Sequence, residues 1–324
     1  MLRSLFTGVS GLRTHQIKMD VVGNNIANIN TIAFKRGRAT FQDMVAQTVR
    51  SASAPAGPVG GMNPAQVGLG VMLGSIDKVH TQGAAMTTMV TTDLMIQGDG
   101  YFMIAERDPE TGQINTDTIR YTRAGNFFFD TEGYLVHRTT GMFVLTITET
   151  QVAANPAGNI PASTPFQPEG APEEVFLNIV RLPIGQLETV AIDAGGNISF
   201  VYYGEIRRFT PGQWDFNATP RPELSGAQTD IARVAIAKFN NAEGLERIGQ
   251  NMFNISANSG PPLVSTPRGE HGQGAILPGA LEMSNVDLAE EFSNMIIAQR
   301  GHQANSRVIR TSDEMLMELA QIRR

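Results

Sequence analysis

The strongest constraint on the fold of this chain is a change in the spacing of its apolar residues. Between residues 2 and 26, apolar side chains recur at alternating intervals of three and four, a repeat of about 3.5 residues that predicts a helix with one apolar seam. Residues 284–324 follow the same spacing. From Thr92 onward the pattern changes to short apolar runs between turn signals, which is typical of antiparallel strands. We therefore expect an α+β fold, with N- and C-terminal helices paired as a coiled-coil-like stalk and a mainly antiparallel β-domain inserted between them.

The apolar seams of the two terminal helices are the first candidate functional surface. Burial of six seam residues contributes roughly 9–18 kcal/mol, whereas ordering about 28 backbone residues costs more than that, at about 1–2 kcal/mol each. Packing on the chain's own core is one interpretation, but this balance favours seams that face other subunits and a first helix that becomes ordered on assembly. The predicted seam residues are Leu2, Leu5, Val9, Leu12, Met19 and Ile26 near the N-terminus, and Leu288, Phe292, Met295, Ile309 and Leu316 near the C-terminus.

A run of asparagines follows the first seam. The segment GNNIANINTIAF at residues 23–34 contains Asn24, Asn25, Asn28 and Asn30. Asn is a poor helix former because its short amide competes for nearby backbone groups, so the helix is expected to end here. The amides can cap carbonyls within the chain or bond sideways to neighbouring chains. Both interpretations stay open, and all four residues join the seam residues as candidates for an assembly interface.

The composition of the connecting segments predicts the domain boundaries. Residues 51–70 are rich in Gly, Pro and Ala, which favours a linker. Clusters of prolines, together with the single tryptophan Trp214, favour loop insertions in the β-domain. The expected division is 1–50 plus 281–324 as the terminal helical domain, 51–75 as a linker, and 76–280 as a β-rich domain with loop insertions near 146–178 and 204–230.

Local signals predict several finer features. Turn residues at 98–100, 130–133 and 195–197 predict three β-hairpins, and the alternating stretch at 230–240 predicts a single strand. Ser284 followed by Asp287 predicts a start of the last helix that resembles a capping box.

The residue content argues against most kinds of chemistry. The chain has no cysteine, which excludes disulfides, cysteine zinc sites and thiol catalysis. Its five histidines lack the close spacing of a metal site, and neither a phosphate-binding loop nor a G-x-S-x-G nucleophile turn occurs. A net charge of −6 lacks the basic excess of a nucleic-acid binder. We therefore expect no catalytic residues, no cofactor, no metal and no nucleic-acid partner.

Hydropathy bears on the compartment. No stretch of the sequence approaches the roughly 20 apolar residues of a membrane span, so we expect no membrane insertion. The N-terminus also lacks the continuous apolar core, about 7–15 residues long, of a secretory signal peptide.

Several motifs resemble one known family. The segment SGLRTHQIKMDVVGNNIANINTIAFKRGR at residues 10–38 resembles the N-terminal signature of bacterial flagellar rod and hook proteins, which continues N-N-[IL]-A-N-x-N-T-x-G-F-K. Ala33 stands where that family usually has Gly. Further blocks at 93–104, 121–136 and 244–260, and the C-terminal LEMSNVDLAEEFSNMIIAQRGHQANSRVIRTSDEMLMEL, resemble the same family in the same order.

This resemblance implies a structural function. The C-terminal block is similar to that of hook proteins, which favours a subunit of the flagellar hook, a self-assembling flexible tube that transmits motor torque to the filament. The distal rod protein of the basal body is the alternative, and the linker bears on the choice, because an extra stiffening segment there is a rod feature. The different-class alternative is a secreted surface adhesin or an exposed β-domain enzyme that would use Trp214.

The family also implies partners and a location. The expected partners are other copies of the chain in a homopolymer, the distal rod, the hook-filament junction and hook-cap proteins, and the flagellar export apparatus. The terminal helices would form the inner tube and the β-domain the outer shell. The expected location is extracellular, in the hook of the bacterial flagellum, after export without a cleaved signal peptide.

Overall fold

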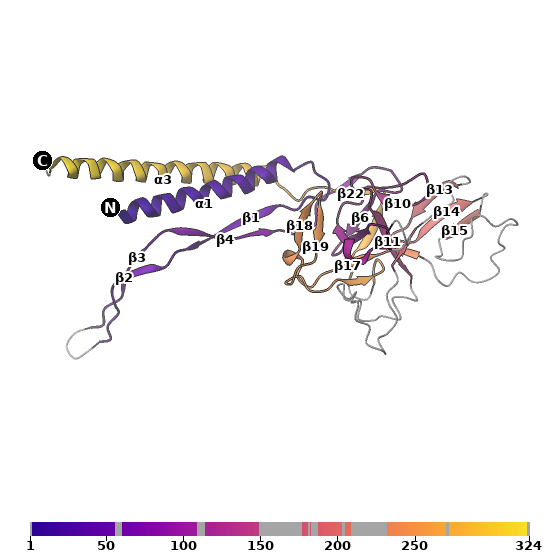
Figure 1. The fold of residues 1–324 in the computed structure, drawn as a ribbon, viewed down its shortest axis with the longest axis horizontal. Coiled ribbons are helices and arrows are strands. Elements are labelled where there is room, and N and C mark those ends of the chain that lie inside the picture. Colours follow the sequence, from indigo (N-terminus) through magenta and orange to yellow (C-terminus); the bar gives the residue numbers. More distant parts are fainter. Residues whose placement is uncertain are drawn as a thin grey trace. The chain divides into compact units, whose positions relative to one another are not determined.

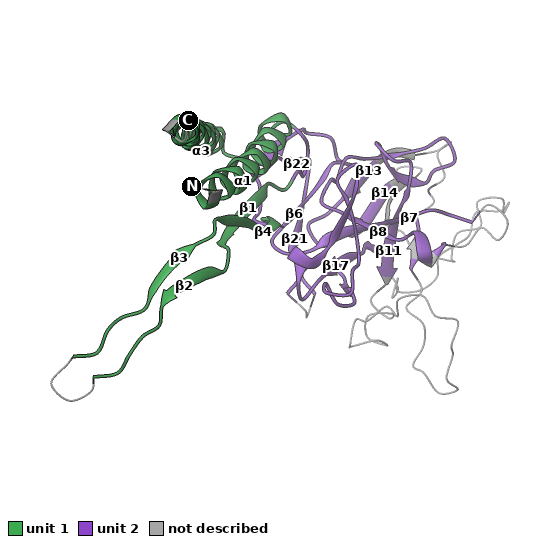
Figure 2. Ribbon diagram, turned by 60° about the vertical axis from the view of Figure 1, so that its left-hand side comes forward, with its two compact units in different colours: residues 1–30, 35–79, 286–324 green, residues 31–34, 80–285 purple. Residues whose placement is uncertain are grey.

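The structure is a computed structural model. It describes residues 2–55, 60–108, 114–148, 177–180, 182, 187–202, 205–208, 232–269 and 272–322. The chain forms two compact units, which we call the helical unit (1–30, 35–79 and 286–324) and the β unit (31–34 and 80–285), and Figure 2 colours them separately. Terminal helices and a mainly antiparallel β-domain between them confirm the predicted α+β fold class.

Two long helices dominate the helical unit. Helix α1 (Leu2–Ala27) and helix α3 (Leu288–Ile322) lie side by side (Figure 1). Helix α3 begins after Asp287, whose carboxylate oxygen Oδ1 accepts hydrogen bonds from the backbone N–H groups of Ala289 (2.8 Å) and Glu290 (3.3 Å). The capping residue is therefore Asp287 itself, and not Ser284 as the sequence predicted.

A long β-hairpin belongs to the same unit. Strands β1 (Gly37–Asp43) and β4 (Val71–Lys78) pair antiparallel, and β2 (Ala46–Arg50) and β3 (Ala65–Gly68) pair in the same sense closer to the turn. The structure thus differs from the predicted linker at 51–75, much of which lies in this hairpin. The Gly and Pro content of the region had favoured a linker. Burial along β4 nevertheless alternates between half-buried and exposed side chains over most of its length, as expected of a strand.

The β unit is built around one sheet. Eleven strands pair antiparallel in the order β18-β19-β8-β7-β11-β10-β9, with β12 and β16 also on β11 and with β17 between β7 and β20. Smaller sheets join β13, β14 and β15, β6 and β21, and β5 and β22. The bounds are β5 (Ala85–Thr87), β6 (Leu94–Gln97), β7 (Tyr101–Ala105), β8 (Arg120–Thr122), β9 (Phe127–Phe129), β10 (Leu135–His137), β11 (Phe143–Thr148), β12 (Asn178–Ile179), β13 (Leu187–Ile192), β14 (Ile198–Tyr202), β15 (Glu205–Arg208), β16 (Ala232–Val234), β17 (Ile236–Lys238), β18 (Glu246–Gly249), β19 (Met252–Asn254), β20 (Leu263–Ser265), β21 (Ala275–Pro278) and β22 (Ala280–Glu282).

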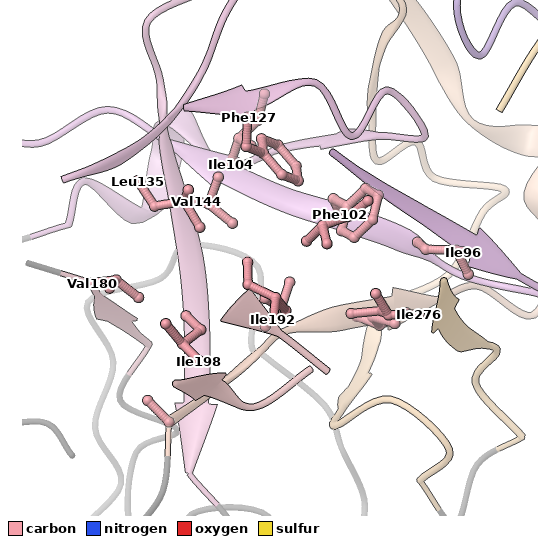
Figure 3. Packing of buried hydrophobic residues seen from close by; sticks show 14 of the residues in the cluster. Ile96, Phe102, Ile104, Phe127, Leu135, Val144, Val180, Ile192, Ile198 and Ile276 are labelled. Atoms are coloured by element: carbon pink, nitrogen blue, oxygen red, sulfur yellow. The ribbon is translucent and has the colours of Figure 1, made fainter. Parts of the chain in front are cut away.

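Strand β7 is buried on both faces. Phe102 and Ile104 pack into one apolar cluster, together with Phe127 and Ile276 (Figure 3). The alternate residues of β7, among them Met103, pack into a second cluster on the opposite face. This two-sided burial explains why residues 101–105 are continuously apolar instead of alternating.

The predicted hairpins meet different outcomes. Strands β9 and β10 pair across the turn at 130–133, and β13 and β14 pair across 195–197, as predicted. The predicted hairpin at 98–100 is wrong, because β6 pairs with β21 while β7 pairs with β8, β11 and β17. Gly98 and Gly100 adopt positive φ angles of 112° and 133°, which let the chain leave one small sheet and enter the main one.

Two further predictions concern residues 146–240. The alternating stretch at 230–240 forms two strands, β16 and β17, which pair with different neighbours. The predicted insertions near 146–178 and 204–230 lie largely outside the described residues, as does Trp214. The described part of the second insertion includes β15, paired with β14.

The short segment 31–34 is anchored in the β unit. Phe34 is buried, and the guanidinium group of Arg247 lies 5.1 Å from the centre of its ring. The N–H of Ala33 donates to the carbonyl of Glu282 (2.8 Å), and Asn251 Nδ2 donates to the carbonyl of Ile32 (2.8 Å). Ala33 has a φ of 58°, the left-handed conformation that the Gly of the family motif adopts without strain.

His137 makes the β unit sensitive to acid. Burial lowers the pKa of His137 from 6.5 to about 4. The unfolded chain therefore takes up a proton near pH 6.5, whereas the folded unit stays neutral until about pH 4. As the pH falls through this window, the free energy of unfolding should drop by up to about 3 kcal/mol. Urea unfolding across the window measures it, and His137→Gln should flatten the dependence. An unchanged slope in that variant would contradict this assignment.

Candidate assembly surface

The contact between α1 and α3 is made mainly of small and polar residues, with Ile309 of α3 packed against Gly8 of α1. The hydroxyl oxygens of Ser4 and Ser312 lie 3.2 Å apart. A Cβ atom added at Gly11 would lie 2.5 Å from Asn305 Nδ2, and one added at Gly301 would lie 2.5 Å from His15 Cε1. These pairs run in opposite directions along the two helices, so the helices are antiparallel and approach closely where glycine faces a larger side chain.

This contact lies one residue away from the predicted seam. On α1 it runs through residues 4, 8, 11, 15 and 25, whereas the predicted seam runs through 5, 9, 12, 16 and 26. On α3 the buried positions are 291, 298 and 312, again one before the seam positions 292, 299 and 313. One residue turns a helix by about 100°. Most of the apolar seam residues therefore flank the helix contact, whereas Ile309, which faces Gly8, lies within it.

Several seam side chains consequently remain accessible in the single chain. Val9 is 54% exposed and Phe292 is 52% exposed, and Leu288 is also exposed. The side chain of Leu2 is outside the description, although its backbone begins α1. The half-buried seam residues are Leu5, Leu12, Met19, Ile26, Met295, Ile309 and Leu316.

Exposed apolar side chains extend this surface beyond the predicted seam residues. Phe6 is 71% exposed on α1, and Ile296 and Ile297 are exposed on α3, yet none follows the strict three-and-four spacing. The uninterrupted run from Met295 to Ile297 was the available signal, because adjacent apolar residues on a helix broaden the stripe beyond one seam. The exposed apolar faces thus extend over more than the predicted residues.

The asparagine run divides into two roles in the structure. Asn25 is buried, and its side-chain amide forms two hydrogen bonds with the backbone of Gly37. Asn25 Nδ2 donates to the Gly37 carbonyl (2.8 Å), and the Gly37 N–H donates to Asn25 Oδ1 (2.9 Å). Asn28 Nδ2 donates to the carbonyl of Asn24 (2.8 Å), an intrachain cap at the end of α1. The side chains of Asn24 and Asn30 are exposed, so they are accessible to another chain.

The hairpin adds a second exposed apolar surface. Val45, Val49, Met62 and Val67 are exposed although they belong to or adjoin paired strands. Closer to the helices the hairpin packs on α1, where the Val71 N–H donates to Ser10 Oγ (3.4 Å). Exposed apolar side chains on a two-stranded ribbon make a candidate interaction surface, because such a ribbon is marginal by itself in water.

The helix contact includes the imidazole ring of His15. Burial, followed by the charges of Lys18 and His302, lowers the pKa of His15.

Within the described residues, no cluster of three or more His, Asp or Glu side chains could hold a metal ion. No helix in this part of the chain is both long enough and apolar enough to cross a membrane.

The close helix approach yields a paired prediction. Gly23 has open space where a Cβ would lie, so Gly23→Ala should raise the free energy of unfolding of the helical unit by about 0.5–1 kcal/mol. Gly301→Ala should lower it by about 1–3 kcal/mol, because the new methyl group meets the His15 ring. Thermal melts followed by far-UV circular dichroism compare the two. Equal stabilisation by both would refute the close contact.

The two roles of asparagine can be separated in the same way. Asn25→Ala leaves both buried backbone groups of Gly37 without their partners, and should lower the free energy of unfolding of the helical unit by about 2–4 kcal/mol. The matched control, Asn30→Ala at an exposed position, should change it by less than about 0.5 kcal/mol. Denaturant unfolding measures both variants. Similar losses of stability would contradict the structural role of the two hydrogen bonds between Asn25 and Gly37.

Comparison with known families agrees with the terminal and central blocks. The family model described as flagella basal body rod protein matches residues 5–35. The model described as flagellar hook protein FlgE/F/G D1 domain matches residues 95–200. The model described as flagellar basal body rod FlgEFG protein C-terminal matches residues 277–322.

Individual relatives extend the similarity over the whole chain. The flagellar basal-body rod protein FlgG of Bacillus subtilis is 39% identical over 324 residues, covering 100% of both chains. The flagellar hook proteins FlgE of Borreliella burgdorferi and Treponema pallidum are 30% and 29% identical over 451 and 473 positions, again with 100% of both chains covered. The chain therefore belongs to the bacterial flagellar rod and hook family of axial proteins.

Proposed function

We propose that this chain is a subunit of the distal rod, which polymerises into the straight, stiff part of the flagellar axis. The family is a structural component of the flagellum. The sequence alone favoured the hook, and the rod was its alternative. Two observations now support the rod more strongly, and the exposed β-hairpin is the one that carries the proposal.

The first observation is chain length. The alignment with the rod protein of Bacillus subtilis spans 324 residues, the length of this chain, and covers all of both proteins. The alignments with the two hook proteins span 451 and 473 positions while this chain supplies 324 residues. Those hook proteins therefore carry long segments that have no counterpart here.

The second observation is the hairpin formed by β1 to β4. The resemblance to the family associates an extra stiffening segment near residues 51–70 with rod members. In this chain the described part of the region includes β3, which pairs with β2, and its Met62 and Val67 side chains are exposed. A hairpin that docks on neighbouring subunits would add contacts that resist sliding, which supports a stiff tube.

Assembly would use the exposed faces of the terminal helices. We propose that the predicted seam residues, with Asn24 and Asn30, contact other copies of the chain. Val9 and Phe292 are exposed on different helices. We propose that different faces of each subunit meet in the polymer, so that the contacts are heterologous and propagate as an open helix. Burial of such side chains at about 1.5–3 kcal/mol each would drive the association.

The flagellar hook remains the second candidate. The C-terminal block SNVDLAEEF is similar to hook proteins, and two hook proteins align over the whole chain. In either case the expected partners include further copies of the chain, adjoining axial proteins and the export apparatus. The hook-specific partners, namely the hook-cap and hook-filament junction proteins, and an extracellular location belong to this second candidate. Export without a cleaved signal peptide is proposed for both.

Electron microscopy of polymerised protein tests the proposal. The purified chain, nucleated on isolated rods, should form straight, stiff tubes, whereas curved tubes would favour the hook. Replacing residues 45–69 by Asn-Gly would close the hairpin between Met44 and Gly70, which are already joined by a hydrogen bond of 2.9 Å. That variant should still polymerise but give tubes that bend more easily. Tubes as straight as those of the unmodified chain would contradict the stiffening role of the hairpin.

A further inference from the structure

A cavity of about 260 Å³ lies within the helical unit, where α1, β1 and the start of α3 meet. Val21 and Val22 of α1 provide an apolar wall. The rest of the lining is mainly polar or charged, with two acidic residues from α3 facing basic residues from the other two elements. The helix contact and the exposed seams described above do not account for this arrangement.

Glu291 is the buried charge of the cavity. Its side chain is only 3% exposed, and its Oε2 atom has no hydrogen-bond partner among the described residues. The first N–H groups of α3 do not supply one, because those of Ala289 and Glu290 already donate to Asp287. Burial raises the pKa of Glu291 despite the opposing effects of Asn25 and Arg36. The cavity thus contains a carboxylate oxygen whose desolvation is not compensated.

Two of the three basic residues that line the cavity are engaged with other acids, and the charge of the third, Lys18, already favours the ionised form of Glu291. Arg36 Nη1 lies 2.6 Å from Glu290 Oε2, and Arg38 Nη2 lies 3.6 Å from Asp77 Oδ2. Lys18 also lines the cavity, but within the described residues it forms no ion pair with Glu291. With the two arginines neutralised, the site can accept one further positive group beside Glu291.

We propose that this cavity receives an arginine side chain from a second copy of the chain, with its guanidinium group donating to Glu291 Oε2. This inference rests on the proposed polymer and deepens it by naming one contact. A guanidinium matches a carboxylate with two parallel donors, and an aliphatic stem suits the valine wall.

The chain itself offers suitable side chains for this contact. Arg13 on α1 and Arg300, Arg307 and Arg310 on α3 are all exposed. These arginines are carried by the same helices whose apolar seams are proposed to meet other copies. Helix packing between copies would therefore bring guanidinium groups and acidic cavities to the same interface, and an ion pair there would fix the register that apolar contacts leave loose.

The first experiment compares Glu291→Gln with a matched control. In the single chain the variant should melt at a higher temperature, because the burial penalty of the carboxylate disappears. In the polymer it should raise the critical concentration about tenfold, because the incoming arginine loses its charged acceptor. Glu314→Gln, at an exposed position of α3, should change neither quantity. An unchanged critical concentration of Glu291→Gln, or a loss of both stability and assembly, would overturn the arginine contact. The proposed function would still stand in that case if the unmodified chain forms tubes.

The second experiment tests the cavity without assembly. Agmatine carries a guanidinium group on a short alkyl chain, and NMR of the side-chain carboxyl carbons follows each glutamate separately. Agmatine bound to the ionised form must lower the pKa of Glu291. The carboxyl signal of the exposed Glu314 is the control and should not respond to agmatine. No change at Glu291 would overturn the site even if the chain polymerises. A selective shift would support the site even if polymerisation failed, so the two proposals stand or fall separately.

Discussion

The close approach of α1 and α3 determines which faces of the terminal helices are left for other molecules. Where Gly301 backs onto the ring of His15, the helices come nearer than larger residues would allow. The contact uses mainly small and polar side chains, with Ile309 against Gly8, so most of the apolar seam is not fully buried within the chain. Pairing the seams with each other would have buried Val9 and Phe292 inside one subunit and left a polar surface with little to drive association. The internal packing of one chain and the capacity to polymerise are therefore two results of the same choice of phase.

The residues that follow α1 make separate contacts within the helical unit and within the β unit. Asn25 fixes the start of β1 to the end of α1 through both backbone groups of Gly37, which a side-chain amide can do because it carries a donor and an acceptor side by side. A few residues later, Phe34 is buried in the β unit, with the left-handed turn at Ala33 setting its direction. The unusual composition of residues 23–34 follows from these demands: amides to satisfy backbone groups where the helix ends, and one aromatic ring to anchor the chain beyond it.

The sequence predicted the kind of elements better than their partners. The spacing of apolar residues indicated the terminal helices and the β-rich middle, and turn residues indicated two of the hairpins, because those signals are local. The spacing did not give the phase of the helix contact, since neighbouring stripes along a helix share the same spacing and a glycine in a helix does not by itself indicate a close approach. The turn at 98–100 was assigned to a hairpin because local turn chemistry does not reveal that both edges of β7 are taken by strands distant in sequence. The cavity around Glu291 could not be predicted from the sequence either, because it forms only where three elements meet in the fold.

The same helices can serve a stiff tube or a flexible one, and the difference under the proposed function lies in what prevents neighbours from sliding. Apolar seams resist separation but only weakly resist a shift along the helix, because one aliphatic side chain replaces another at little cost. An ion pair in a cavity permits one register, since moving a guanidinium away from a buried carboxylate leaves both charges unpaired. A hairpin with exposed apolar side chains adds contacts far along the chain from the seams, at Val45 and Val67. Rigidity would then come from polar and hairpin contacts laid over a common apolar interface, so relatives that share the helical ends can differ in stiffness.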